Sequence, residues 1–453
     1  MIRKAALTAC SNGQNLQKKD EISRLKTALS KLGVQTEDSP CLYAADGPFS
    51  GTPAGRAQAL MDFFLKDDIE AVFDISGGDI ANELLPFLDY DLIREKGKTF
   101  WGYSDLTALI NAIYSMTGNS SVLYQVKNLI WEKGALQQQR FAGFLNDSPT
   151  DLFDLHYHFL RGSRMEGIVI GGNVRCLLKL AGTPYFPDPT GKILLLEALG
   201  GETAQLACYF AQMAQMGVFE KAAGILLGTF TRFEASGADR TVFDLLSPWL
   251  PETLPVAATP EIGHGADAKA IRIGSYARFL EVRTPGLVLQ PLGMRFLEST
   301  NAYSSDPVNT EYMMFLPYDG PEETARFLTS SEKNWNAAAP LELNFAVLKD
   351  SLHAGTVTLY FEDLPEDTAE LGWVLAKDFH GKGIAFAAAQ ALIRYASEEL
   401  GIRHLIACCD SANQPSRHLM EKLGMKKTGE QGGRKNRGCD EERTELQYRL
   451  DLA

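Results

Sequence analysis

Apolar positions in the first part of the chain follow two alternating patterns. Short continuous apolar runs, typical of buried strands, occur in KAALTAC (4–10), IEAVFDIS (69–76) and KTFWGY (98–103). Between them, apolar residues recur at helical spacing, as in ISRLKTALSKL (22–32) and in the segment that begins at Leu106. Strands that alternate with helices predict a parallel sheet covered on both faces. Such sheets bind ligands beyond the carboxyl ends of their strands.

The pattern changes near Glu166, where short β-rich runs separated by turns replace the alternation. A polar stretch at 297–312, LESTNAYSSDPVNTEY, is typical of a linker or a domain edge. Further strands follow it, together with a long amphipathic helix closed by Gly401. We therefore expect an α/β protein made of a flavodoxin-like parallel-sheet domain at 1–160, a sheet-rich domain at 161–292 and an α+β domain at 293–453.

Composition and charge narrow the classes of partner. A chain of 453 residues with 45% hydrophobic and 22% charged residues is typical of a multidomain globular protein. Its formal net charge of -13 argues against a nucleic acid polymer, which needs a basic face. No run reaches the ~18 apolar residues of a membrane span. The apolar stretch in MIRKAALTACSNG is shorter than the ~7–15 residues of a secretory signal. The sequence therefore predicts a cytoplasmic protein without a membrane partner.

Ser104 lies between a strand-like run and a helix-like run in WGYSDLTALINAIYSMTG. A hydroxyl there can cap the helix, which is the commoner role for this stretch alone, or act as a nucleophile at a sharp turn. A serine nucleophile needs a histidine base and a group that orients it. His264 lies in a glycine-flanked loop, whereas His156 and His158 lie in a segment without turn residues. Glu197 ends the apolar run KILLLE, either as a paired acid or as an ordinary strand-end charge.

Four segments extend this interpretation, and they occur in the order SGGDIANELLPFLDYDLI, WGYSDLTALINAIYSMTG, EGIVIGGNVRCLLKLAGTPYFPDPTGKILLLEALGG and EIGHGADAKAIRIG. Over about the first 290 residues they resemble the serine peptidase family that contains LD-carboxypeptidases and microcin C immunity peptidases. The resemblance implies a cofactor-free peptidase with Ser104 as nucleophile and with Glu197 and His264 completing its triad. It also implies that the backbone N–H groups of Gly78 and Asp105 form the oxyanion hole. A helix N-terminus behind the nucleophile would direct N–H groups and a positive dipole at that oxyanion.

Two departures from the family pattern bear on the substrate. Ser76 stands where the murein-cleaving branch usually has an arginine, and Gln125 lies near the place of a glycine–proline pair. The wording SGGDIANELLPFLDYD is similar to that of the microcin C immunity branch. The resemblance thus implies peptidase chemistry more firmly than it implies a particular substrate.

A second motif lies in the last third, where HGKGIAFAAAQAL follows the strand-like run ELGWVLA and precedes NQPSRHLMEKLGM. Glycines that enter a helix after a strand offer N–H groups to a pyrophosphate. Over 311–453 these segments resemble the GNAT acetyltransferases, especially their ribosomal-protein-acetylating branch. The resemblance implies acetyl-CoA as cofactor, bound through Gly381, Gly383, Ala385, Asn413 and Ser416.

Glu370 stands where many members of that family keep a carboxylate that deprotonates the acceptor amine, although a solvated strand charge is an equal alternative. His380 and Met420 depart from the family pattern, and the N-terminal strand and helix of the family look abbreviated. The seven cysteines include no CxxC pair, which is typical of reduced thiols, and we expect no metal site.

These observations predict a bifunctional enzyme, a serine carboxypeptidase or amidase of the microcin C immunity type joined to an N-acetyltransferase. Its expected substrate is a small molecule or short peptide, such as an aminoacyl-nucleotide-like toxin. One alternative is a murein tetrapeptide LD-carboxypeptidase in cell-wall recycling, and another is a C-terminal domain that only senses acetyl-CoA. The sequence names neither the physiological substrate nor the acetyl acceptor, and it leaves a homodimer open.

Overall fold

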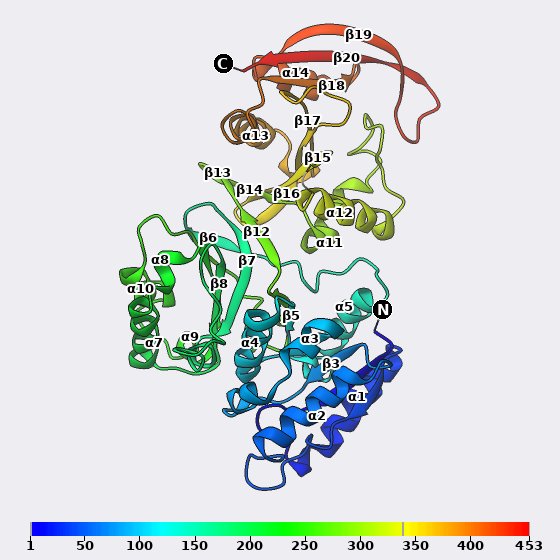
Figure 1. Ribbon diagram of the computed structural model, residues 1–453. Coiled ribbons are helices and arrows are strands. Elements are labelled where there is room, and N and C mark those ends of the chain that lie inside the picture. The colour runs from blue at the N-terminus through cyan, green and yellow to red at the C-terminus, as the bar shows by residue number, and fades with distance from the viewer. Residues whose placement is uncertain (1, 338, 453) are drawn as a thin grey trace. The chain divides into compact units, whose positions relative to one another are not determined.

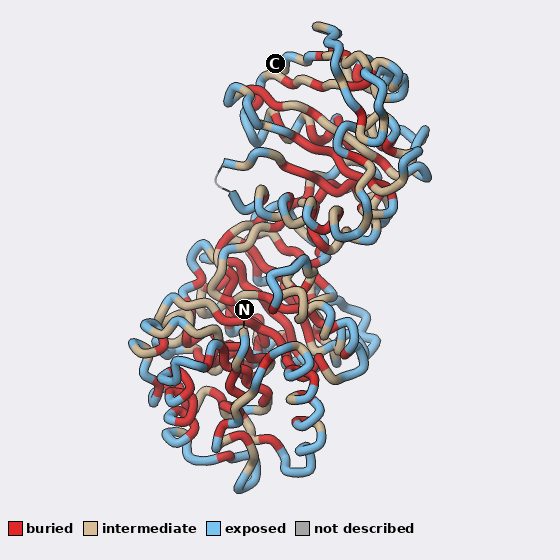
Figure 2. Tube along the Cα trace, turned by 90° about the vertical axis from the view of Figure 1, so that its right-hand side faces the viewer, coloured by how far each residue is buried: buried red, intermediate tan, exposed pale blue. Residues whose placement is uncertain are grey.

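The computed structural model describes residues 2–337 and 339–452. The chain forms two compact units, Met1–Phe279 and Leu280–Ala453, which Figure 1 shows in blue to green and in yellow-green to red. The buried segments fill the interior of each unit and the exposed ones its surface (Figure 2). The sequence predicts a domain boundary between 292 and 293, whereas the structure divides the chain between 279 and 280. The boundary lies earlier because Leu280, Leu287 and Leu289 pack in the core of the second unit.

The first unit begins with a six-stranded sheet in the order β11-β5-β4-β3-β1-β2. Strands β1 to β5 are parallel, and β11 pairs antiparallel with β5. The order β2-β1-β3-β4-β5 is that of flavodoxin-like folds, which confirms the predicted class. The strands are β1 (Lys4–Thr8), β2 (Gln35–Asp38), β3 (Ala71–Asp74), β4 (Thr99–Gly102), β5 (Ser121–Leu123) and β11 (Ile271–Ile273).

Helices cover both faces of this sheet, as its apolar strands predict. Ala5 and Leu7 share a cluster with residues of α1 and α5, whereas Ala6 packs with residues of α2 and α4. The sheet is therefore the middle of three layers. Its helices are α1 (Lys19–Lys31), α2 (Pro53–Leu65), α3 (Tyr90–Lys96), α4 (Thr107–Thr117) and α5 (Gly134–Leu145).

A second six-stranded sheet in the first unit has the order β12-β7-β8-β9-β10-β6. Strands β7 to β10 are parallel, and β6 runs antiparallel to β10. Its strands are β6 (His158–Arg161), β7 (Arg164–Asn173), β8 (Ile193–Ala198), β9 (Gly224–Phe230), β10 (Val256–Ala258) and β12 (Tyr276–Leu280). Its helices are α6 (Val174–Leu178), α7 (Thr203–Gln215), α8 (Val218–Lys221), α9 (Thr231–Ala235) and α10 (Val242–Leu246). One cluster joins the two sheets, since Leu109 and Ile110 of α4 pack with Val169 of β7 and Leu194 of β8.

The second unit is built on an eight-stranded sheet in the order β13-β14-β15-β16-β17-β18-β20-β19. Its pairs are antiparallel except for β17 and β18, which are parallel. The strands are β13 (Val282–Thr284), β14 (Leu287–Pro291), β15 (Glu342–Lys349), β16 (Leu352–Tyr360), β17 (Thr368–Leu375), β18 (His404–Asp410), β19 (Lys426–Lys435) and β20 (Glu442–Asp451). The helices are α11 (Leu297–Ser304), α12 (Pro321–Trp335), α13 (Ile384–Leu400) and α14 (Gln414–Lys422).

Two expectations for this unit are wrong. The polar stretch at 297–312 is not a linker, because it begins with α11, in which Thr300, Tyr303 and Ser304 are buried. The N-terminal part of the unit is also not abbreviated, since β13, β14, α11 and α12 all precede β15. Hydroxyl-bearing residues on a buried helix face caused the first error, because they are polar by composition and yet are buried here; of the three, Tyr303 pairs its Oη with Thr356 Oγ1 at 2.6 Å.

Among the residues that the structure describes, no helix has the length and apolar character needed to span a bilayer.

Candidate active site

Ser104 begins the turn from β4 into α4. Strand β4 ends at Gly102, and one 3-10 turn, Ser104–Leu106, leads into α4 at Thr107. The φ of Ser104 is 56°, in the left-handed region, which costs a non-glycine residue roughly 1–2 kcal/mol. Within the described residues, neither helix start has a side-chain capping hydrogen bond, so helix capping does not explain this serine. A strained strand-to-helix turn of this kind exposes a nucleophilic hydroxyl.

Glu197 and His264 form a buried pair in the same unit. Glu197 lies at the end of β8 and is fully buried, and its Oε2 lies 2.9 Å from His264 Nδ1. A carboxylate at Nδ1 holds that proton and leaves Nε2 as an acceptor. Nε2 of His264 is buried and has no hydrogen-bond partner among the described residues. The imidazole is therefore oriented as a base whose accepting nitrogen is free.

Tyr103 adds a third group to this pair. Its hydroxyl lies 3.1 Å from His264 Nδ1 and donates to Glu197 Oε2 at 3.4 Å. Burial, reinforced by the Glu197 carboxylate, raises the pKa of Tyr103 well above its usual value, so the phenol stays protonated. The sequence does not indicate this role, because an aromatic residue in KTFWGY has the same pattern as core packing.

Ser104, Gly78 and His264 line one cavity of about 660 Å³. The loops that follow β1, β3, β4 and β5 contribute to its wall, and these loops lie at the carboxyl ends of the parallel strands. This is where a flavodoxin-like sheet places its ligand. No hydrogen bond joins Ser104 to His264 in the described structure, although such bonds are often long before substrate binds.

The turn at Ser104 is fixed by the side chain of its neighbour. Asp105 is fully buried, and its carboxylate accepts hydrogen bonds from Ser11 Oγ at 2.7 Å and from the Ala81 N–H at 2.9 Å. Lys179 forms an ion pair with the same carboxylate. One carboxylate therefore ties the turn at Ser104 to the loops after β1 and β3.

Gly78 lies in that second loop with a φ of 134°, and a Cβ there would come within 2.2 Å of Asn12 Cγ. Asn12 holds the loop, because its Oδ1 accepts from the Asp79 N–H at 3.1 Å and its N–H donates to Gly77 O at 3.3 Å. Only glycine fits this approach. The loop is thus held with its backbone against the cavity that Ser104 lines.

Helix α4, which follows Ser104, also forms hydrogen bonds with the sheet that carries Glu197. The Asn111 side chain of α4 pairs twice with the backbone of Gly171, at 2.9 and 2.8 Å. Thr107 Oγ1 accepts from the Asn173 N–H at 3.0 Å, and Asn173 is in register with Glu197. These bonds set the position of the serine turn relative to the glutamate.

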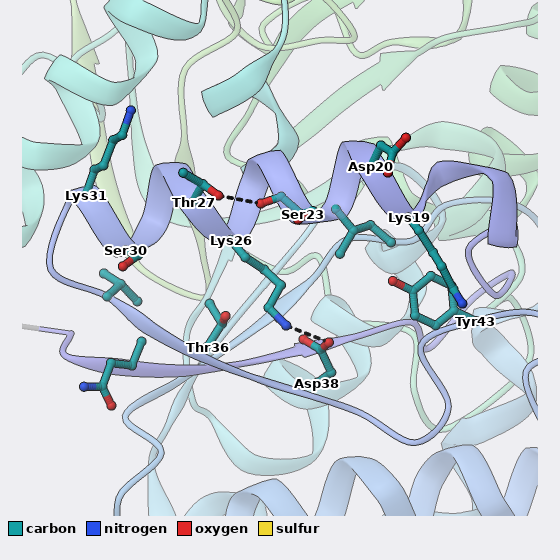
Figure 3. Close-up of a pocket in the computed structure, with 13 residues that line it drawn as sticks. Lys19, Asp20, Ser23, Lys26, Thr27, Ser30, Lys31, Thr36, Asp38 and Tyr43 are labelled. Atoms are coloured by element: carbon teal, nitrogen blue, oxygen red, sulfur yellow. Dashed lines mark hydrogen bonds and ion pairs between the residues drawn. The ribbon is translucent and has the colours of Figure 1, made fainter.

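A larger open groove of about 800 Å³ lies between α1 and β2 (Figure 3). None of the predicted site residues lines it. Two of its polar side chains are paired, since Lys26 Nζ lies 2.8 Å from Asp38 Oδ2 and Thr27 Oγ1 donates to Ser23 O at 2.9 Å. The groove offers no chemistry comparable with that of the Ser104 cavity.

In the second unit, the loop before α13 has two positions whose backbone conformation favours glycine. Gly381 and Gly383 have φ values of 69° and 75°, and Gly383 is the N-cap of α13, with Ala385 in the first turn. A Cβ at either glycine would meet no atom within 4 Å, so backbone conformation rather than space requires glycine. This arrangement fits a pyrophosphate, because it presents N–H groups at a helix start.

Strands β17 and β18 pair only over their first halves, up to Glu370 and Ile406. Beyond that point Trp373 Nε1 donates to Ser416 Oγ at 3.2 Å. Asn413 is the N-cap of α14, and its Oδ1 accepts from the Ser416 N–H at 3.1 Å. The loops after the two strands thus bring Asn413 and Ser416 beside the point where the strands separate.

Glu370 is the last residue of β17 in this pairing. Burial, followed by the Glu445 carboxylate, raises the pKa of Glu370, and Arg434 opposes the rise. A raised pKa brings a carboxylate nearer to the range of a general base at neutral pH. Among the described residues, no group of three or more histidine, cysteine or acidic side chains is arranged to hold a metal ion.

Profiles of known families match the chain in three places. The LD-carboxypeptidase N-terminal domain matches residues 5–124, and the LD-carboxypeptidase C-terminal domain matches residues 166–279. An acetyltransferase (GNAT) domain matches residues 287–426. The first two matches contain Ser104, Glu197 and His264, and the third contains Glu370 and the glycine loop before α13.

Similar proteins agree with these matches. The microcin C7 self-immunity protein MccF of Escherichia coli is 29% identical over 230 residues, which cover 44% of this chain and 67% of that protein. A probable murein peptide carboxypeptidase of Bacillus subtilis is 29% identical over 271 residues, covering 56% and 83%. The structure of MccF in complex with glutamyl sulfamoyl guanosine aligns with a TM-score of 0.55 at 23% identity, over 61% of this chain and 92% of that one, and so shares its fold. The chain therefore belongs to the LD-carboxypeptidase family, and it carries a GNAT acetyltransferase domain C-terminal to the peptidase part.

Proposed function

We propose that the chain is a bifunctional enzyme that hydrolyses the acyl bond of aminoacyl-nucleotide-like toxins and acetylates amines with acetyl-CoA. The observation that carries the first activity is the cavity in which Ser104, at a strained turn, meets a histidine whose Nδ1 side is held by buried Glu197. MccF, a microcin self-immunity protein, supports the choice of substrate class.

In the proposed hydrolysis, His264 Nε2 removes the proton of Ser104 Oγ as that oxygen attacks the substrate carbonyl carbon. Glu197 stabilises the imidazolium that forms, and the Tyr103 hydroxyl keeps the Glu197 carboxylate in place. The N–H groups of Gly78 and Asp105 receive the oxyanion. His264 then protonates the leaving group. In the second half of the reaction His264 Nε2 deprotonates a water that attacks the acyl carbon and then returns that proton to Ser104 Oγ, which releases the acyl group as a carboxylic acid.

In the proposed acetylation, the N–H groups at Gly381, Gly383 and Ala385 bind the pyrophosphate of acetyl-CoA. When bound, acetyl-CoA supplies the acetyl group as a thioester. Asn413 and Ser416 border its pantetheine arm, and Glu370 accepts the proton of the attacking amine. The raised pKa of Glu370 supports this role, since it leaves a buried carboxylate better matched to a proton from an amine.

A murein tetrapeptide LD-carboxypeptidase is the second candidate, because the murein peptide carboxypeptidase of Bacillus subtilis is aligned over 83% of its length. Ser76, which stands where the murein-cleaving branch usually has an arginine, favours the toxin substrate.

The test is hydrolysis of an aminoacyl sulfamoyl adenosine and of a murein tetrapeptide by purified wild type and Ser104→Ala. We expect the kcat/KM of wild type for the sulfamoyl adenosine to be at least tenfold higher than its kcat/KM for the tetrapeptide. Ser104→Ala should lose on the order of 10⁶ in kcat, as triad serines do. Preference for the tetrapeptide would establish the second candidate, and cleavage of neither would refute both.

A further inference from the structure

Three lysines of the first unit, the buried Lys127 and Lys269 and the half-buried Lys179, stand out because ammonium groups removed from water are costly without a partner. Lys269 forms ion pairs with Asp151 and Glu261, each at 3.0 Å, and Lys179 forms one with Asp105. Both are thereby compensated. Lys127 is the third, and its surroundings differ.

Lys127 lies in the 3-10 turn Val126–Ile130 that follows β5, and it is 7% exposed. Its Nζ donates to Gln14 Oε1 at 3.5 Å and lies 5.7 Å from the centre of the Trp131 ring. Gln14 is itself held, because its Nε2 donates to Ile75 O at 3.2 Å. Both neighbours are neutral, so among the described residues no carboxylate forms an ion pair with this ammonium.

Burial lowers the pKa of Lys127, and Glu21 and Asp74 offset this only in part. An ammonium has three donors, and a long bond to a neutral amide leaves most of that capacity unused. The fold therefore keeps a buried cation that its own side chains do not neutralise. Such a group in a cavity is a candidate for ligand binding.

The cavity it faces is the one that contains the nucleophile. The cavity lined by Ser104 and His264 is also lined by Lys127, Gln14 and Trp131. A substrate that reaches Ser104 thus enters the space in which Lys127 lacks an anionic partner.

We propose that Lys127 binds an anionic group of the hydrolysed substrate next to its scissile bond. The group is an oxygen-bearing anion, which is either the ionised acyl-sulfamate linker of an aminoacyl nucleotide analogue or the terminal carboxylate of a peptide. This inference rests on the proposed hydrolysis and adds its determinant of specificity. Lys127 selects charged substrates and does not take part in bond cleavage.

The test uses two pairs of substrates that differ in charge beside the scissile bond. One pair is an aminoacyl sulfamoyl adenosine and the neutral amide of the same amino acid with 5′-amino-5′-deoxyadenosine. The other is a murein tetrapeptide and its C-terminal amide. Each is measured with wild type, Lys127→Met, Lys127→Arg and Lys18→Met, the last a matched control at an exposed lysine that lines the same cavity.

We expect Lys127→Met to lose about 10- to 100-fold in kcat/KM on the anionic member of the cleaved pair, the range for one charge-assisted hydrogen bond. The loss should lie mainly in KM, and the neutral member should change less than threefold. Lys127→Arg should restore most of the loss, and Lys18→Met should stay near wild type. The pair that shows the effect identifies the source of the anion. Equal losses on anionic and neutral members, or no loss, would overturn the proposal.

Binding without turnover separates this proposal from the proposed function. Titration calorimetry with the sulfamoyl adenosine and with the tetrapeptide compares Ser104→Ala with Ser104→Ala/Lys127→Met. If adding Lys127→Met raises the Kd at least tenfold, Lys127 binds the anion as proposed, even if wild type cleaves none of the four compounds. An unchanged Kd, or no binding of either probe to Ser104→Ala, refutes it. Thermal melts check folding, and Lys127→Met should melt at or above wild type, because it removes an uncompensated buried charge.

Discussion

Ser104 combines two properties that pull in opposite directions. Its left-handed backbone favours glycine, whereas its proposed chemistry requires a hydroxyl. We predict that Ser104→Gly raises the free energy of unfolding by up to about 1 kcal/mol, because glycine adopts a φ of 56° without a Cβ penalty. Ser104→Ala is the matched control, since it keeps the Cβ and should stay near wild type. Urea unfolding measures both, and a Ser104→Gly variant less stable than Ser104→Ala would show that the turn is not strained.

The three residues of the proposed triad should act as one unit. His264→Ala and Glu197→Gln should each lose several orders of magnitude in kcat, and adding Ser104→Ala to either should cost little more. The reason is that His264 Nε2 has nothing to deprotonate once the hydroxyl is gone. Hydrolysis rates of the single and double variants measure this. Fully additive losses would contradict the assignment of these three residues to one mechanism.

Some residues of the candidate site can be predicted from the sequence and others cannot. Ser104, Glu197 and His264 follow from ordered motifs, and the structure places Glu197 against His264 and both Ser104 and His264 on one cavity. Tyr103 and Lys127 do not follow, because a tyrosine beside a strand and a lysine in a short turn have ordinary patterns. Their importance depends on burial and on partners from distant parts of the chain, which periodicity does not contain.

At the scale of elements, the side chain of Asp105 connects the start of α4 to two loops and to Lys179. We predict that Asp105→Asn lowers the free energy of unfolding by about 3 kcal/mol, since it leaves Lys179 without its ion-pair partner and weakens three bonds. Denaturant unfolding measures the loss from the transition in which the first unit unfolds. The double variant Asp105→Asn/Lys179→Met should recover part of it, and no recovery would mean that the charge pair is not the cause.

The same elements show what hydrophobic patterning captures. The apolar runs at β1, β3 and β4 and the helical spacing of α1 and α4 were sufficient to predict the parallel sheet. Patterning failed for Leu297–Ser304 and for the strands at 282–291, where the structure places a helix and two strands inside the second unit. Serine, threonine and asparagine make up half of this helix, so composition predicts an exposed segment although Thr300 and Ser304 are buried. Asn301 bonds the helix to α12, because its Oδ1 accepts from Thr324 Oγ1 at 2.9 Å.

At the scale of the whole molecule, two proposed chemistries share one chain. If both act on an aminoacyl nucleotide, one cleaves its acyl bond and the other blocks its α-amine, and each removes a feature that a synthetase pocket binds. We predict that wild type protects a toxin-sensitive host, that Ser104→Ala and Gly383→Val each protect less, and that the double variant does not protect. Gly383→Val is disruptive because valine is strained at a φ of 75°. Growth under toxin measures protection.

Purified single variants provide the control for that experiment. Ser104→Ala should retain acetyl transfer and Gly383→Val should retain hydrolysis, because the two residues lie in different compact units. Absence of protection by wild type, or full protection by both single variants, would contradict detoxification and favour cell-wall recycling.

Strand β11 belongs to the first sheet although it follows most of the second sheet in the chain, and this determines which fragments of the protein can fold. Strand β11 pairs with β5, whereas its neighbours along the chain, β10 and β12, belong to the second sheet. A fragment that ends at residue 160 would lack β11 and would expose the edge of β5, a site for aggregation. Residues 1–279 should therefore melt in a single calorimetric transition, as one cooperative folding unit. Recombination can add or remove the acetyltransferase as a module, but it cannot exchange the two halves of the peptidase independently.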